Sequence, residues 1–395
     1  MRSRMRPRRA LVTTTIALSA DKFHRELVRQ LQSDGYDVCV VSSPGQGLEN
    51  LRRDLGVRTR ELRMTREISL WADVCALAKW MRLCLAERPQ LIVAATPKAS
   101  LLSMMAGRAT GVPRRLYSAV GLRLEGARGN RRRLLAAVER ATTSAATEVV
   151  ANSPSLAARY RELRLAPEHK LRQTLPASSH GVDCSHFQPG PPDPDLAQGL
   201  GLDLTRPIVG FVGRLTHDKG IQTLLDAMAE LADAGSQVQL LVVGPQDEAD
   251  SDDYLEKLAT IGGCVVAVGA VEDIRPYFSL MDVHVLPTLR EGFPNVVLEA
   301  SAMEIPTVTT DATGSVDSVL SGRTGLLVRR QEPDALAKAL RTLIDDPETA
   351  EQYGREARQW VAEAFRPDAV VRSLLTCPAP RSRPEEGLGT PCASS

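Results

Sequence analysis

The chain has 395 residues, of which 43% are hydrophobic and 25% are charged. This balance is normal for a globular protein with a sizeable core, and the length suits two domains of ordinary size. No apolar run approaches the roughly 20 residues that a membrane helix needs, so no transmembrane helix is expected.

The net charge of +1 is the sum of a surplus of basic residues in one part of the chain and a surplus of acidic residues in the other. Residues 1–180 hold 32 Lys and Arg against 15 Asp and Glu, whereas the remainder holds 17 against 33. Such asymmetry points to a charged partner, and we expect the basic half to face anionic lipid headgroups or a diphosphate-bearing acceptor. The alternative is a solvated, arginine-rich surface. Nucleic acid is not an expected partner, because the few aromatic residues form no stacking array and no binding motif is present.

The seven cysteines are scattered and form no C-x-x-C pair. This spacing argues against a zinc site and favours a reducing cytosol. We expect the cysteines to be small apolar residues of the core.

The first residues of the chain predict a basic arm followed by an α/β unit. Residues 1–9 hold five arginines and are expected to be mobile. Residues 10–20 resemble a signal peptide in outline, but three threonines and a serine weaken the apolar segment. A β-branched strand over 11–16 is the better interpretation. A helix over 21–33 and a strand over 36–41 then begin a parallel sheet.

The alternation of strand and helix continues through the first half. Further strands are expected at 91–95, 114–118 and 148–151, and helices at 71–87 and 131–145. The strand 91–95 is wholly apolar, as a strand covered on both faces should be. Lys98 follows it at the carboxyl end, where ligands of open α/β sheets bind. Lys98 is therefore a candidate acceptor-side cation, and a solvated surface lysine is the alternative.

Prolines separate the two halves of the chain. Residues 175–194 hold five of them, which is the composition of an interdomain linker. His180 and His186 lie in this stretch without a third ligand nearby, so we expect structural roles for them and not a metal site. The predicted boundaries are a first domain at 10–178, a linker at 179–198 and a second domain at 199–348.

The second domain opens with a loop that suits a diphosphate. A strand over 208–212 leads into Gly213-Arg214-Leu215-Thr216-His217-Asp218-Lys219-Gly220, and a helix over 221–234 follows. Gly213 lets the backbone come close to a ligand. Arg214 offers a planar fork and Lys219 a point charge, and both groups suit phosphate oxygens. Taken alone, this loop is a weak signal, because many α/β loops carry Arg and Lys.

A second loop of the same kind lies further along the chain. An apolar strand over 281–287, a loop over 289–295 and a helix over 296–303 place a helix N-terminus beside two carboxylates, Glu291 and Glu299. A helix N-terminus attracts phosphate, and carboxylates accept hydrogen bonds from hydroxyls. A nucleotide-sugar has both groups. The alternative is an ordinary strand–loop–helix unit with two solvated glutamates.

The segment E-G-F-P-N-V-V-L-E-A, with seven residues between Glu291 and Glu299, resembles the E-x7-E motif of family-four retaining glycosyltransferases. The segment G-F-V-G-R-L-T-H-D-K-G-I at 210–221 resembles the donor-phosphate segment of the same family. The resemblance runs from about residue 10 to residue 365 and is more specific in the second half. Within the family, it is to bacterial enzymes that build capsule, exopolysaccharide or lipid-linked oligosaccharides. It implies the GT-B architecture, in which two Rossmann-like α/β domains face each other across a cleft.

The resemblance also implies roles for single residues. Arg214 and Lys219 would bind the donor diphosphate and stabilise the departing nucleotide, Glu291 would hold the sugar ring and Glu299 the ribose. No metal and no cofactor is implied besides a nucleoside-diphosphate-sugar substrate, with a UDP-sugar favoured and a GDP-sugar possible. The acidic run at 250–253 lies in a polar loop just before a helix, where acidic residues suit the helix dipole, and is not interpreted as a metal site. The remaining donor-binding candidates are Gly213, Val271, Gly292, Phe293, Pro294, Asn295 and Val296.

One position departs from the family pattern. Relatives commonly carry His or Arg just before the glycine that matches Gly121, where this chain has Val120. Arg123 is a candidate to supply a charge nearby. Two other functions stay open: a nucleotide-sugar 2-epimerase on the same architecture, and a relative that binds without catalysis. The expected function is transfer of a hexose to a hydroxyl of a lipid-linked or polysaccharide acceptor.

The end of the chain is expected to return to the first domain. A helix over 349–376 would cross back, and residues 377–395, rich in Pro, Arg, Glu and Ser, would be disordered. The basic first half and the reducing cytosol together predict a cytoplasmic protein that is peripheral on the inner face of the membrane.

Overall fold

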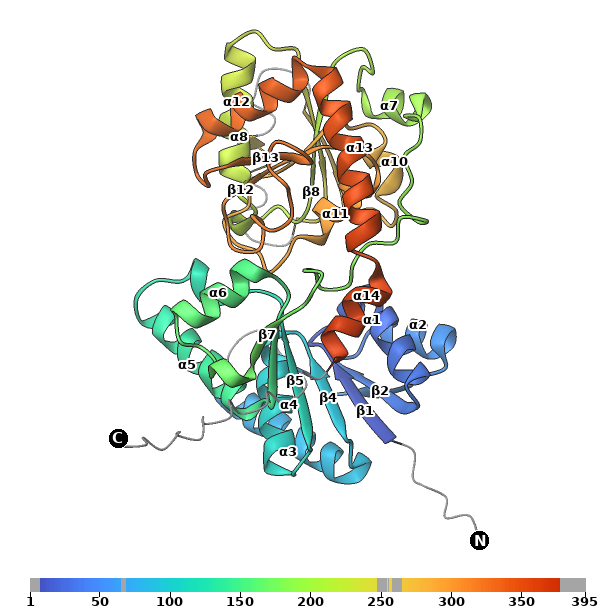
Figure 1. The fold of residues 1–395 in the computed structure, drawn as a ribbon, viewed down its shortest axis with the longest axis vertical. Coiled ribbons are helices and arrows are strands. Elements are labelled where there is room, and N and C mark those ends of the chain that lie inside the picture. The colour runs from blue at the N-terminus through green and yellow to red at the C-terminus, as the bar shows by residue number, and fades with distance from the viewer. Residues whose placement is uncertain (1–7, 65–68, 247–253, 255, 258–264, 377–395) are drawn as a thin grey trace, which may run out of the picture.

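The computed structural model describes residues 8–64, 69–246, 254, 256–257 and 265–376. Figure 1 shows two α/β domains stacked along the long axis of the molecule. The expected tail at 377–395, the acidic run at 250–253 and most of the expected arm lie outside the described residues. Within the described ranges, none of the helices is both long and apolar enough to cross a bilayer.

The first domain is built on a parallel sheet of order β3-β2-β1-β4-β5-β6-β7. Its strands are β1 Arg8–Thr13, β2 Tyr36–Ser42, β3 Arg58–Glu61, β4 Leu91–Ala94, β5 Arg114–Ala119, β6 Glu148–Ala151 and β7 Leu171–Gln173. Its helices are α1 Ala17–Ser33, α2 Gln46–Leu55, α3 Leu70–Glu87, α4 Pro97–Ala109, α5 Gly129–Ala145 and α6 Pro154–Glu162, with short 3₁₀ turns at η1 Arg123–Gly126 and η2 Glu168–Lys170.

Both faces of this sheet are covered by helices. Leu11 of β1 packs in one core with Trp80 of α3, whereas its neighbour Val12 packs in the opposite core with Leu27 of α1. Successive side chains of a strand point to opposite faces. The central strands are therefore apolar on both sides, which is why their sequences read as continuous apolar runs.

The second domain repeats this architecture with a parallel sheet of order β10-β9-β8-β11-β12-β13. Its strands are β8 Ile208–Val212, β9 Gln239–Val243, β10 Val265–Gly269, β11 Val283–Leu286, β12 Thr307–Thr310 and β13 Gly325–Val328. Its helices are α7 Pro194–Leu200, η3 His217–Lys219, α8 Ile221–Asp233, α10 Arg275–Phe278, α11 Asn295–Ala302, α12 Pro333–Ile344 and α13 Pro347–Ala364. The predicted pair of Rossmann-like domains is confirmed.

The C-terminal segment returns to the first domain as a separate helix. The prediction of one helix over 349–376 is wrong: α13 ends at Ala364, and α14 Pro367–Leu375 begins after a break. Proline disfavours a helical residue before it, which explains the break at Arg366. Val361 of α13 packs with the second domain, whereas Val371 and Leu374 of α14 join the core beside α1 (Figure 1).

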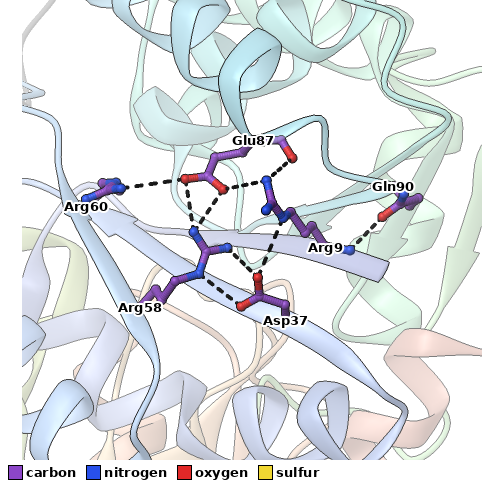
Figure 2. A network of polar contacts seen from close by, with 6 residues as sticks. All are labelled: Arg9, Asp37, Arg58, Arg60, Glu87 and Gln90. Carbon is purple, nitrogen blue, oxygen red and sulfur yellow. Dashed lines mark hydrogen bonds and ion pairs between the residues drawn. The ribbon is translucent and has the colours of Figure 1, made fainter. Parts of the chain in front are cut away.

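The start of the fold lies earlier than predicted, because Arg8 and Arg9 belong to β1 and not to a mobile arm. Arg9 forms ion pairs with Asp37 and Glu87, at 3.6 and 3.3 Å, and its N–H donates to Gln90 Oε1 at 2.6 Å. Arg58 of β3 binds the same two carboxylates (Figure 2). This network joins the first three strands to the end of α3 at the edge opposite the cleft.

The predicted burial of the cysteines is confirmed for Cys39 and Cys84. Burial raises the pKa of each of these thiols to about 11. Cys75 is exposed on α3, so the prediction is wrong there, and Cys184 is half-buried. Cysteines 264, 377 and 392 lie outside the described residues.

Candidate active site

The loops at the carboxyl edge of the second sheet pack backbone against backbone. A Cβ atom on Gly220 would lie 1.9 Å from the carbonyl oxygen of Pro287, and one on Gly244 would lie 1.8 Å from that of Gly213. Gly220 and Gly244 also have φ angles of +72° and +150°. Only glycine fits these positions, and the tight packing holds the β8, β9 and β11 loops together.

The loop after β11 leads into α11 much as predicted. Pro294 is the residue before the helix, and the helix begins at Asn295, one position earlier than the predicted start at 296. The Glu291 N–H donates to the carbonyl of Thr313 at 3.0 Å. Thr288 Oγ1 donates to the carbonyl of Asp218 at 2.9 Å, which ties this loop to the β8 loop.

Two ion pairs cross between these loops. Lys219 Nζ pairs with Glu291 Oε1, and both side chains are largely buried, at 18% and 16% exposed. Arg290 pairs with Asp218, so two adjacent residues of one loop bind two adjacent residues of the other. The structure thus brings Lys219 and Glu291 together, as candidates for one site. Arg290 and Asp218 were not singled out from the sequence, although each adjoins a residue that was.

The other two charged candidates are Arg214, in the loop after β8, and Glu299, on α11. Arg214 follows β8 directly and is exposed. Glu299 is half-buried on α11, and desolvation raises the pKa of its carboxyl to about 7, while the charge of Lys22 on α1 opposes this rise. Lys22 belongs to the first domain, so Glu299 lies on the side of α11 that faces that domain.

The first domain approaches this site at a pair of glycines. A Cβ atom on Gly292 would lie 2.1 Å from the carbonyl oxygen of Val120. Gly121, at φ +140°, lies against Gly292 on the other side, and Gly314, at φ +77°, packs on the Gly292 carbonyl. Val120 therefore touches the loop of Glu291 through its backbone.

A second interdomain contact runs through η1 and α6. Thr313 Oγ1 donates to Glu125 Oε1 at 2.9 Å, and Arg159 Nε donates to the same oxygen at 3.0 Å. Ser155 Oγ donates to Asp317 at 2.5 Å and accepts the Gly314 N–H at 2.7 Å. These contacts fix the two domains against each other beside Glu291. The sequence carries no short-range signal for them, because the partners are far apart along the chain.

The side chain of Asn295 forms hydrogen bonds with the chain at the start of the predicted linker. Its amide nitrogen donates to the Gly181 carbonyl at 2.9 Å, and its oxygen accepts from Ser178 Oγ at 3.2 Å. Only the backbone at Asn295 can therefore face a phosphate in this arrangement. His180 stacks on Phe23 of α1 with ring centroids 5.1 Å apart. Burial lowers the pKa of His180 to about 4, so it is a neutral packing residue at pH 7.

Three further candidates contribute apolar packing. The Phe293 ring is buried against Phe365, with centroids 5.7 Å apart, so its side chain belongs to the core and not to a ligand site. Val296 and Val271 are partly buried and pack against the core around β9 and α10. Any donor contact of Phe293 would have to come from its backbone.

Lys98, the candidate acceptor-side cation, is already engaged. Its Nζ lies 2.6 Å from Asp73 of α3, and its side chain is 8% exposed. The alternative of a solvated surface lysine is wrong, because the packing of α3 on α4 buries Lys98 beside Asp73, and the acceptor-side role stays a prediction. Among the described residues, no cluster of three His, Cys, Asp or Glu side chains has the geometry of a metal site.

Comparison with known proteins decides the family. A profile described as "Glycosyl transferase 4-like domain" matches residues 21–174, and one described as "Glycosyl transferases group 1" matches residues 206–346. The capsular polysaccharide biosynthesis glycosyltransferase CapM of Staphylococcus aureus is 32% identical over 355 residues, covering 89% of this chain and 91% of the relative. The chain belongs to the group 1 glycosyltransferases.

Solved structures agree on the fold of this glycosyltransferase. Sucrose-phosphate synthase of Thermosynechococcus elongatus superposes with a TM-score of 0.75 at 23% identity, over 92% of this chain and 96% of the other. HepE of Anabaena, in complex with UDP and glucose, gives a TM-score of 0.76 at 18% identity, over 93% and 98%. At these identities the likeness concerns the GT-B architecture alone.

Proposed function

We propose that this enzyme transfers a hexose, with retention of configuration, from a nucleoside-diphosphate-sugar to a hydroxyl of a lipid-linked or polysaccharide acceptor during cell-surface glycan assembly. The observation that carries the proposal is the Lys219–Glu291 pair, which sits at the carboxyl edge of the second sheet, where ligands of open α/β sheets bind. The similarity to CapM, a capsular enzyme, supports the acceptor class. A UDP-sugar is favoured, since HepE has been solved with UDP-glucose.

The donor diphosphate lies between Arg214, Lys219 and the N–H groups that open α11. In the free protein, Lys219 is held by Glu291; in the complex, Lys219 shares its charge with the diphosphate and Glu291 accepts hydroxyls of the sugar ring. Glu299 accepts the ribose hydroxyls. As the glycosidic bond breaks, negative charge grows on the departing nucleotide, and these preorganised groups stabilise it most in the transition state.

Retention follows from attack on the face that the leaving group departs from. The acceptor hydroxyl attacks the anomeric carbon as the diphosphate leaves, and a phosphate oxygen takes the proton. We assign no protein nucleophile, and the two glutamates are not a glycosidase pair. The interdomain contacts at Gly292 and Ser155 keep water from the donor while the domains are together.

The protein works at the inner membrane surface in this proposal. One face of α3 exposes Trp71, Val74 and Leu85, which are 80%, 61% and 59% exposed, next to the exposed cations Lys79 and Arg82. An amphipathic helix that combines large apolar side chains with cations suits an anionic interface. This arrangement supports a peripheral location with the first domain toward the lipid.

The test is a transfer assay. Purified protein, UDP-glucose or UDP-galactose, and a lipid extract from cells that make capsule are incubated with and without EDTA. The expected result is a lipid-bound hexose whose anomeric configuration, read by NMR, matches that of the donor. Turnover of donor to a 2-epimer without transfer would favour the epimerase alternative, and an inverted product would refute retention.

A further inference from the structure

The first domain carries a groove that the donor chemistry does not use. It has a volume of about 450 Å³ and runs along α5. Leu124, Ala136, Leu163 and Leu165 form its apolar lining, and Arg132, Arg133 and Arg140 also line it. This volume falls within the roughly 300–1,000 Å³ of small-molecule sites. Arg140 closes the far end, since its guanidinium donates to the carbonyls of Leu163 and Arg164.

A second, polar hollow of about 380 Å³ continues this groove toward the second domain. It is lined by Arg128, Arg132 and Arg159 together with Glu125, and it shares Gly129 and Arg132 with the apolar part. Arg159 pairs with Glu125. In the part of the chain that the structure describes, Arg128 and Arg132 form no ion pair, so this end of the groove carries a net positive charge.

The polar end lies next to the candidate active site. Glu125 Oε1 accepts from Thr313 Oγ1, and the Thr313 carbonyl accepts the N–H of Glu291. Thr313 thus links the backbone of Glu291 to Glu125, which lines the hollow. The apolar part lies on the other side of Arg132, further from the second domain.

We propose that this groove binds the acceptor as an amphiphile, with a phosphate or diphosphate at Arg128 and Arg132 and an apolar chain over Ala136 and Leu163. The inference rests on the proposed function, since it supplies the acceptor site for that reaction. Arginine forks suit phosphate oxygens, and an apolar floor suits a hydrocarbon chain. The order of the two parts points the anionic head, and the hydroxyl or sugar that it carries, toward the donor.

Farnesyl diphosphate, kept below its critical micelle concentration, is the probe, and it is titrated calorimetrically into the full-length protein. Saturating UDP is present throughout, so that the donor-phosphate site is blocked. Inorganic diphosphate and farnesol are titrated in parallel, because they carry only the head or only the chain. Farnesyl diphosphate should bind more tightly than either fragment by about tenfold or more, as joined contacts predict.

The variants separate this groove from general surface charge. Arg132→Ala should lower the affinity for farnesyl diphosphate by about tenfold, the size of one charge-assisted contact. The affinity for farnesol should not change. Arg131→Ala is the matched control, since Arg131 is exposed on the same helix and lines neither part of the groove. Ala136→Trp should fill the apolar part. The affinity for farnesyl diphosphate should then fall to the affinity for inorganic diphosphate. If that variant fails to fold, Leu163→Ser replaces it.

Three results would overturn the proposal. The first is equal affinity for farnesyl diphosphate and inorganic diphosphate, which would mean a free-anion site. The second is an equal loss of affinity for farnesyl diphosphate in Arg131→Ala and Arg132→Ala, which would mean that general surface charge attracts the ligand. The third is an unchanged affinity after the groove is filled. If UDP itself does not bind, the donor assignment fails, whereas the three titrations still report on the groove.

Discussion

At the residue scale, two ion pairs organise the candidate active site. Asp218 and Lys219 in one loop bind Arg290 and Glu291 in the other. Each charge is compensated in the free protein, so the site is held in shape before the donor arrives. In the proposed donor complex, a diphosphate would bring negative charge to Lys219 and would let Glu291 turn to the hydroxyls of the sugar. Preorganisation of this kind reduces the reorganisation needed at the moment of reaction.

If Glu299 holds the ribose as proposed, ligand binding should depend on pH. Desolvation raises the pKa of its carboxyl to about 7, so it is mostly protonated at pH 6 and mostly ionised at pH 8. Ribose hydroxyls donate to the ionised form, and the ligand therefore favours ionisation. The affinity for UDP should fall by about tenfold between pH 8 and pH 6, following the ionised fraction.

Calorimetric titration of UDP at several pH values measures this dependence. Glu299→Gln is the matched control, because it keeps the amide oxygen as an acceptor and cannot ionise. The ratio of the two affinities removes the titration of UDP itself. A ratio that stays constant across pH 6–8 would show that Glu299 does not hold the ligand.

The sequence predicted which residues gather at the site better than it predicted what each side chain does there. Lys219 and Glu291 follow neighbouring parallel strands, so the topology alone places them at one edge of the sheet. Phe293 lies in the same loop, but its ring packs on Phe365 of the C-terminal segment. Lys98 is neutralised by Asp73. Both outcomes depend on tertiary packing, which local patterns do not encode.

At the element scale, α14 is the part of the C-terminal segment that belongs to the first domain. Its last carbonyls have no partner within the helix. Arg172 donates to the carbonyl of Ser373 at 2.9 Å, and Arg114 donates to that of Leu375 at 2.7 Å. Both arginines also pair with Glu148. A positive charge at a helix C-terminus is favourable, so this cluster anchors α14 across the sheet edge.

Removing one of these arginines should loosen the anchor. Arg172→Ala should lower the free energy of unfolding by about 1–3 kcal/mol, because it deletes charge-assisted bonds to two carbonyls and to Glu148. Urea denaturation followed by circular dichroism measures the change. Arg161→Ala is the control: within the described ranges, the side chain of Arg161 forms a surface pair with Glu168, and its loss should stay within about 0.5 kcal/mol. Equal effects of the two variants would contradict the anchoring role.

At the scale of the whole molecule, backbone contacts at Gly292 stand beside the side-chain contacts of Glu125 and Ser155 where the two domains meet. Gly292 lies against the Val120 carbonyl with no room for a Cβ atom. The two-domain architecture and the order of strands and helices were predictable, because the spacing of apolar residues and the length of each run indicate whether a segment is a strand or a helix. The approach of the domains was not, since it depends on contacts between residues more than a hundred positions apart.

Gly292→Ala tests whether this approach matters for catalysis. The added methyl group would meet the Val120 carbonyl at 2.1 Å, so the domains must separate slightly. The transfer rate should fall by about a hundredfold, the cost of a misplacement near 1 Å, and small-angle scattering should show a larger radius of gyration. Gly199→Ala is the matched control, because nothing lies within 4 Å of a Cβ atom there. Native activity of Gly292→Ala would mean that this contact does not position the reacting groups.

The central claim is that the loops of Arg214, Lys219 and Glu291 bind a nucleoside diphosphate. The most direct measurement is calorimetric titration of UDP, GDP and ADP into the purified protein, first without metal and then with magnesium. We expect metal-independent binding of one nucleotide, with UDP favoured, and an affinity lower by about tenfold or more in Arg214→Ala, the size of one charge-assisted contact. Binding of none of the three nucleotides, or binding that Arg214→Ala leaves unchanged, would contradict it.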